Sequence, residues 1–173
     1  MEVIVEILKI VLPAGLVIYG MYIIVVSFLK NERDSKLIAL KTKNTETILP
    51  IRLQAGERLC LLLERVRPNN LIRRVNTGNY TAQELHRLLV EEVRDEFNHN
   101  LSQQVYFSDE TWESVKNAVE QVITMINRAS QDLNEEARGI DLNKRIFQLF
   151  LERKQDSISI ALKKVKSEIR IHF

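Results

Sequence analysis

The stretch EFNH at residues 96–99 comes closest to a chemical motif in this chain of 173 residues. Glu96 and His99 stand three positions apart, so a helix would place a carboxylate and an imidazole on one face. Helical bundles that bind two metal ions use two such pairs, with glutamates from two further helices. The other two histidines, His86 and His172, have no acidic residue three positions earlier. The sequence therefore predicts no metal or other cofactor, and a metal-dependent enzyme is the weakest functional alternative.

Amide side chains crowd the end of the helix that we expect to begin after Thr81 and to last until about Gln104. They can satisfy backbone groups that are left open where two helices turn. Alternatively, they can recognise a partner protein together with neighbouring aromatic residues. The candidates for such a partner-binding surface are Asn98, His99, Asn100, Gln103, Gln104, Tyr106 and Trp112.

Other motifs that carry chemistry are missing from the sequence. There is no glycine loop for phosphate, no nucleophile elbow, no H-E-x-x-H and no C-x-x-C. The single cysteine, Cys60, has no metal-ligand spacing around it and is expected to pack in the core. We therefore expect a protein that is not an enzyme.

Four arginines, at positions 65, 67, 73 and 74, surround the turn at Pro68. Arginines in such a cluster commonly pair with local glutamates. They can also bind lipid phosphates or an acidic partner. The sequence does not decide between local ion pairing and binding of lipid or a partner.

Residues 10–29 form a run of twenty amino acids without a charge. As a helix, this run would be about 30 Å long, which matches the hydrocarbon core of a bilayer. The residues before it are not basic, and no small-residue cleavage site follows it, unlike in a secretory signal. Residues 1–30 are therefore predicted to be an uncleaved transmembrane anchor.

Basic residues are distributed unequally around this run. Lys9 precedes it, whereas residues 30–43 hold five basic and two acidic residues, a net charge of +3. The positive-inside rule then places the N-terminus outside and the rest of the chain in the cytoplasm. Residues 31–48 form a predicted basic juxtamembrane linker. The candidates for contact with anionic lipid headgroups are Lys30, Arg33, Lys36, Lys41 and Lys43.

The remaining residues, 44–173, contain nineteen basic and nineteen acidic side chains and so carry no net charge. Nucleic-acid-binding domains present a basic surface, so we expect no nucleic acid as partner.

Apolar periodicity predicts an all-α protein, with a transmembrane helix followed by a cytoplasmic bundle of four or five helices in residues 49–173. Its first helix is predicted to begin at Pro50, and Gly56 within it suggests close packing against a neighbour. A capping box at Thr81 and Glu84 starts the next helix, and Ser108 caps another. The apolar stripe of that helix, residues 112–133, favours an internal bundle seam over a dimeric coiled coil. Two more apolar stripes, at 142–150 and 158–169, are separated by a polar stretch and leave open whether they form one helix or two.

Residues 49–74 and 96–112, together with the apolar run, resemble an uncharacterised family of single-span, membrane-anchored helical proteins from Bacteroidota. The resemblance covers nearly the whole chain. It implies a protein of the bacterial inner membrane and supplies no catalytic residues.

These features lead us to expect a non-enzymatic accessory or scaffold subunit of an inner-membrane assembly, which docks partners through its cytoplasmic helices. Other inner-membrane proteins or further copies of the chain are the expected partners. The main alternative is a protein that binds the surface of anionic membranes.

Overall fold

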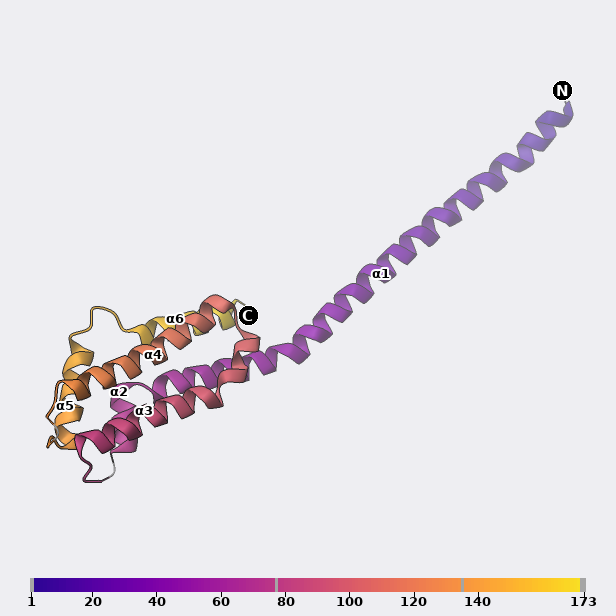
Figure 1. Cartoon of the computed structure of the whole chain (residues 1–173). Coiled ribbons are helices and arrows are strands. Elements are labelled where there is room, and N and C mark those ends of the chain that lie inside the picture. The colour runs from indigo at the N-terminus through magenta and orange to yellow at the C-terminus, as the bar shows by residue number, and fades with distance from the viewer. Residues whose placement is uncertain (1, 77, 135, 172–173) are drawn as a thin grey trace. The chain divides into compact units, whose positions relative to one another are not determined.

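The computed structural model describes residues 2–76, 78–134 and 136–171, with the backbone alone for residues 2–14, 34, 35 and 37–46. Within these residues the protein is all-α, as predicted, and an isolated bridge between Thr81 and Arg138 is the only β feature. The helices are α1 (Glu2–Arg65), α2 (Pro68–Val75), α3 (Ala82–His99), the 3-10 helix η1 (Leu101–Tyr106), α4 (Asp109–Gln131), α5 (Gly139–Leu151) and α6 (Ser157–Arg170) (Figure 1).

The chain divides into two units, residues 1–48 and 49–173. Helix α1 is continuous from Glu2 to Arg65, so the prediction that a helix begins at Pro50 is wrong. A proline inside a helix removes one backbone hydrogen bond and its ring crowds the carbonyl four residues earlier, yet α1 continues on both sides of Pro50. Pro50 instead lies two residues beyond the end of unit 1.

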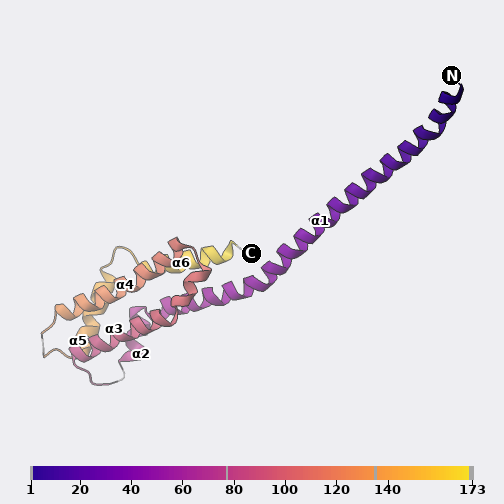
Figure 2. The ribbon, with the colours of Figure 1, turned by 45° about the vertical axis from the view of Figure 1, so that its right-hand side comes forward.

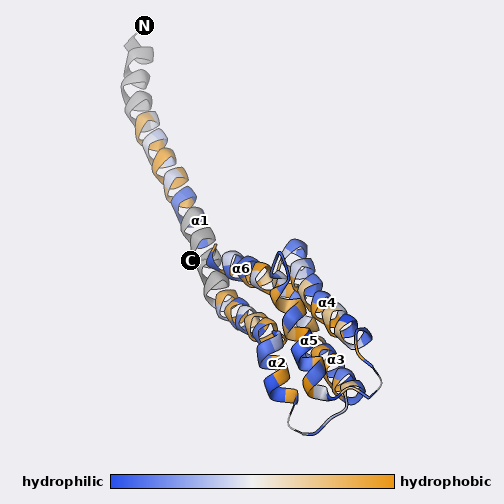
Figure 3. Cartoon of the chain, turned by 90° about the vertical axis from the view of Figure 1, so that its left-hand side faces the viewer, coloured by the Kyte–Doolittle hydropathy of each residue, from blue (hydrophilic) through white to orange (hydrophobic). Residues whose placement is uncertain are grey.

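Unit 1 contains one segment, Gly15–Arg33, whose length and composition suit a membrane-spanning helix. Twelve large apolar residues between Leu16 and Leu29 are each 46–69% exposed, and no residue of the segment's apolar window is buried. Hydrophobic residues occur on its successive turns in Figure 3. This segment therefore presents apolar side chains around its whole circumference.

Unit 2 packs the end of α1 and helices α2–α6 around one hydrophobic core. Helix α4 packs against α6, α3 and α5, and α3 also contacts α2 and α5. Figures 1 and 2 both show α4 and α6 side by side. The described residues of unit 2 contain six α-helical segments. This number exceeds the four or five expected, because Pro68–Val75 forms a separate short helix.

The apolar stripe of α4 lies inside unit 2. Val115, Val119, Val122 and Ile126 are at most 2% exposed, so the predicted internal seam is confirmed. Trp112, at the start of the seam, stacks on Phe97 of α3, with ring centroids 5.5 Å apart. This aromatic pair joins the end of α3 to the beginning of α4.

Side-chain caps begin α3 and α4 as the sequence predicts. The Thr81 hydroxyl accepts a bond from the Glu84 amide while the Glu84 carboxylate accepts one from the Thr81 amide, which completes the capping box. The Ser108 hydroxyl accepts a bond from the Thr111 amide at the start of α4. These caps satisfy backbone donors that a helix start leaves open.

Helix α3 ends at His99, five residues before its predicted end at Gln104. The Asn100 side chain donates to the Glu96 carbonyl at 2.8 Å and competes with continuation of the helix. The chain then tightens into the 3-10 helix η1.

The polar stretch after α5 does break the helix. Asp156 accepts a bond from the Ile158 amide and caps α6, so the two apolar stripes belong to separate helices. Near the end of α6, Ile169 lies against Gly56 of α1. A Cβ atom added at Gly56 would come within 2.9 Å of the Ile169 side chain, so the predicted close packing at this glycine is confirmed.

Candidate partner-binding site

The predicted amide-rich surface is divided between the exterior and the core. Asn98, His99 and Gln104 are exposed, and Asn100 and Tyr106 are half-buried. Gln103 and Trp112 are buried, at 7% and 9% exposure. The two buried residues stabilise the turn from α3 into α4, so a partner has direct access mainly to the three exposed ones.

The Asn100 side-chain amide has a structural role, because it donates a hydrogen bond to the Glu96 carbonyl at the end of α3. His99 also bonds its own helix, with Nδ1 2.7 Å from the Asp95 carbonyl oxygen. These bonds satisfy open backbone groups, which is the structural role that the sequence left as one of two alternatives for the amides.

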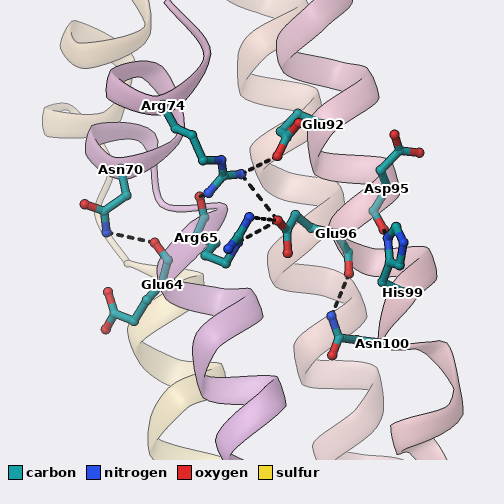
Figure 4. Close-up of polar contacts among 9 residues, drawn as sticks. All are labelled: Glu64, Arg65, Asn70, Arg74, Glu92, Asp95, Glu96, His99 and Asn100. Carbon is teal, nitrogen blue, oxygen red and sulfur yellow. Dashed lines mark hydrogen bonds and ion pairs between the residues drawn. The ribbon is translucent and has the colours of Figure 1, made fainter.

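Glu96 and His99, the pair with metal-ligand spacing, have different neighbours. Figure 4 shows Glu96 directed toward the arginines of α1 and α2, whereas His99 lies beside Asp95. The described part of the chain contains no group of three or more His, Cys, Asp or Glu side chains arranged to hold a metal ion.

The arginines around Pro68 are largely engaged with glutamates, the first of the two alternatives. Arg65 and Arg74 both approach the Glu96 carboxylate, and Arg74 also pairs with Glu92 at 2.8 Å (Figure 4). Arg67 lies 3.4 Å from Glu64 and 3.8 Å from Asp156. These ion pairs tie α1 and α2 to α3 and to the start of α6.

The end of α1 is stabilised by the same group of side chains. Asn70 donates to the Glu64 carbonyl at 2.8 Å, and Arg74 approaches the Arg65 carbonyl at 3.5 Å. The last carbonyls of a helix lack partners within the helix and carry partial negative charge, so amide and guanidinium donors are favourable there. The arginine cluster thus has a structural role at this helix end.

The structure describes the side chains of three of the five residues that we expect to contact lipid headgroups. Lys30, Arg33 and Lys36 are exposed, and Lys36 pairs with Glu32 one turn earlier at 2.7 Å. Lys41 and Lys43 lie among the residues whose side chains are outside the described part of the structure.

Cys60 is half-buried and packs against the core of unit 2. Burial raises the pKa of its thiol, although Lys166 opposes this shift. A raised pKa keeps the thiol protonated at neutral pH and lowers its reactivity. This environment suits a structural cysteine.

Sequence patterns missed a cavity between α4 and the connection from α5 to α6. It has a volume of about 330 Å³ and combines two arginines with a glutamate and apolar side chains. The arginines, Arg128 and Arg153, are 25 residues apart in the chain. No local spacing signals that they lie near each other.

The fold therefore defines an all-α protein in which a fully apolar helical segment precedes a helical bundle with an ion-paired surface. The chain belongs to the family of unknown function DUF7935, whose model matches residues 2–172. No curated protein and no solved structure matches it. The predicted membership of an uncharacterised family is thereby confirmed, while the bacterial group and the single membrane span stay predictions.

Proposed function

We propose that this protein is a non-enzymatic, membrane-anchored accessory subunit. In this proposal the apolar part of α1 spans the bacterial inner membrane, and unit 2 docks a partner protein on the cytoplasmic side. The exposed apolar segment of unit 1 is the observation that carries the proposal.

The distribution of apolar residues on that segment favours lipid over a protein partner as its cover. Residues 21–26 are six consecutive apolar residues, and all of them are exposed. Because successive residues on a helix are about 100° apart, these side chains point in every direction around the axis. A helix that pairs with one other helix needs a single apolar stripe, whereas a helix in a bilayer is apolar on all sides.

The charges after the segment support the proposed orientation. Lys30 and Arg33 follow the apolar residues directly and are exposed, as is Lys36. Basic residues next to a span favour the cytoplasmic side. Unit 2, which begins at residue 49, would then lie in the cytoplasm.

Extraction of membranes tests the anchoring. Membranes from cells that express the full chain are washed with alkaline carbonate and then with mild detergent. We expect the protein to resist carbonate and to dissolve in detergent. Release by carbonate would show peripheral attachment and would contradict the proposed span.

Cysteine labelling tests the orientation. Leu151 is 82% exposed, so Leu151→Cys in a Cys60→Ala background provides one accessible thiol in unit 2. We expect a membrane-impermeant maleimide to label it only after the inner membrane is opened. Labelling in intact spheroplasts would place unit 2 on the outer side.

Crosslinking and purification test the docking function. The full chain is crosslinked in native membranes and purified in mild detergent. Recovery of a defined protein in stoichiometric amount, or of a defined oligomer of the chain, is the expected result. A monomer without partners under these conditions would contradict the proposal.

A second candidate function is binding to anionic lipids, which the exposed Lys30 and Arg33 favour. Each basic residue near an anionic surface contributes about 1 kcal/mol. Replacement of Lys30, Arg33 and Lys36 by glutamine should then reduce enrichment in vesicles that contain phosphatidylglycerol relative to neutral vesicles. If the unaltered chain reconstitutes equally into anionic and neutral vesicles, binding to anionic lipids is excluded as its function.

A further inference from the structure

The cavity between α4 and the α5–α6 connection is lined by charged, polar and apolar side chains. Arg128 and Thr124 lie on the α4 side, and Glu152 and Arg153 follow α5. Met125 and Leu149 contribute apolar surface to the same lining. A volume of about 330 Å³ is at the lower end of the range for small ligand sites.

Arg153 is held in place without neutralisation of its charge. Its Nη2 donates to the Gln121 carbonyl of α4 at 2.8 Å, while its Nη1 is buried without a hydrogen-bond partner among the described residues. Burial lowers the pKa of this guanidinium, and Asp156 only partly opposes the shift. A cation in such a position gains from a nearby anion, because burial is unfavourable for an unpaired charge.

Two carboxylates close in sequence to these arginines, Asp132 and Asp156, have other partners. Asp132, one turn after Arg128, pairs with Arg145 at 2.7 Å. Asp156, three residues after Arg153, caps α6 and accepts a bond from the Ser159 hydroxyl at 2.6 Å. No described carboxylate forms an ion pair with either Arg128 or Arg153.

We propose that this cavity binds a carboxylate side chain of an acidic peptide segment on the partner protein, with Arg128 and Arg153 facing the carboxylate. An aliphatic neighbour of that carboxylate would pack on Met125 and Leu149. Thr124 is a further hydrogen-bond donor in the lining. This inference rests on the proposed docking function and specifies the chemistry of the partner.

The lining favours a peptide carboxylate over a phosphate group. Glu152 lines the same cavity and repels a dianion more strongly than a single negative charge. Met125 and Leu149 offer apolar surface that suits an aliphatic side chain. An acidic residue beside a leucine matches both properties.

Fluorescence anisotropy with a defined peptide tests the site. The probe is a fluorescein-labelled peptide of sequence Gly-Leu-Glu-Leu-Gly with blocked ends, and its matched control has glutamine in place of glutamate. The full chain is measured in neutral detergent micelles. We expect the glutamate peptide to bind at least about tenfold more tightly, because a hydrogen-bonded ion pair is lost with glutamine.

Variants of the protein then assign the binding to the cavity. Arg128→Gln should weaken binding of the glutamate peptide about tenfold, whereas Glu152→Gln should strengthen it by removing repulsion. Arg73→Gln, at an exposed arginine of α2, is the matched control and should leave binding unchanged. Circular dichroism of each variant verifies that the helices are intact.

Three results would overturn the proposal. The first is equal binding of the glutamate and glutamine peptides, and the second is equal weakening by Arg128→Gln and Arg73→Gln. The third is displacement of the peptide by submillimolar inorganic phosphate, which would assign the arginines to a phosphate ligand. Their failure is distinguishable from failure of the proposed function, because crosslinking in native membranes tests docking separately and carbonate extraction tests anchoring separately.

Discussion

The carboxylate of Glu168 on α6 accepts two hydrogen bonds from Ser108, one from its backbone amide and one from its hydroxyl, each 2.8 Å long. Ser108 is also the residue that caps α4. One carboxylate near the end of the chain therefore stabilises the start of a helix sixty residues earlier. Arg52 of α1 lies 3.6 Å from the same carboxylate, so three helices meet at this point.

Replacement of Glu168 should change the dependence of stability on pH. Burial favours the neutral form of this carboxyl, but bonds from Thr111 and Ser108 and the charge of Arg52 outweigh it and lower the pKa of Glu168. A lowered pKa means that the folded state releases the proton more readily than the unfolded state. The stabilisation is therefore present above the ordinary glutamate pKa of about 4.3 and is lost as the pH falls through the lower folded value.

We expect Glu168→Gln to lower the free energy of unfolding at pH 7 by about 1–2 kcal/mol, since charge-assisted bonds become neutral ones. The variant should also lose less stability than the unaltered chain on acidification below pH 4.5. Urea unfolding in detergent, followed by circular dichroism between pH 3 and 7, measures both effects. Glu120→Gln, at an exposed position of α4, is the control. If the free energy of unfolding falls equally with pH for Glu168→Gln and the unaltered chain below pH 4.5, the proposed role of the Glu168 pKa is contradicted.

Gly56→Ala tests the close contact between α1 and α6. Alanine is favoured over glycine in a helix by about 1 kcal/mol, but its Cβ would lie 2.9 Å from two atoms of Ile169. We expect net destabilisation of about 1–2 kcal/mol from overpacking. In an Ile169→Ala background the same change should instead stabilise the protein, because the obstructing atoms are absent. Thermal unfolding measures both effects. If Gly56→Ala changes stability in the same direction with and without the Ile169 side chain, the two residues are not sterically coupled.

Glu96→Ala tests the arginine cluster. The Glu96 side chain is 15% exposed and meets Arg65 and Arg74, so its removal leaves two guanidinium groups without this partner. We expect the free energy of unfolding to fall by about 2 kcal/mol at most. Solvent weakens the contribution of Arg65, because its side chain is 47% exposed. Asp95→Ala changes the neighbouring exposed carboxylate and should cost less than about 0.5 kcal/mol. Equal losses for both variants would show that the cluster adds no specific stability.

Charges placed in the apolar segment test its insertion in lipid. Arginine at the centre of a span costs about 3 kcal/mol per residue, so Met21→Arg combined with Ile24→Arg should move the protein out of the carbonate-resistant membrane fraction. Val105→Arg introduces a charge at a residue of η1 that is 79% exposed, and it should leave the fraction unchanged. Retention of the double variant in carbonate-washed membranes would contradict insertion of this segment.

Several features could be predicted from the sequence because they depend on residues close together in the chain. The capping box of Thr81 and Glu84 needs only a spacing of three. The apolar stripe of α4 needs only helical periodicity, and its inward orientation follows once neighbouring helices exist. The internal seam and the caps were therefore predicted correctly.

Other features could not be predicted, because local patterns leave competing outcomes nearly equal. Pro50 suits the first turn of a helix, yet α1 continues through it. Trp112 suits a recognition surface as well as a core, and stacking against Phe97 places it in the core. The end of α3 depends on a bond from Asn100 to Glu96 that competes closely with another helical turn.

The sequence by itself determined that the protein is all-α and has one long apolar segment, because helical periodicity, caps and hydrophobicity act over a few residues. Only the tertiary structure decided which charged groups are neutralised. Glu168 lies near Arg52, Glu96 near Arg65 and Arg74, and Arg153 forms no ion pair within the described residues. Charge pairing depends on distances of a few ångströms between helices far apart in the chain, and only their packing sets those distances.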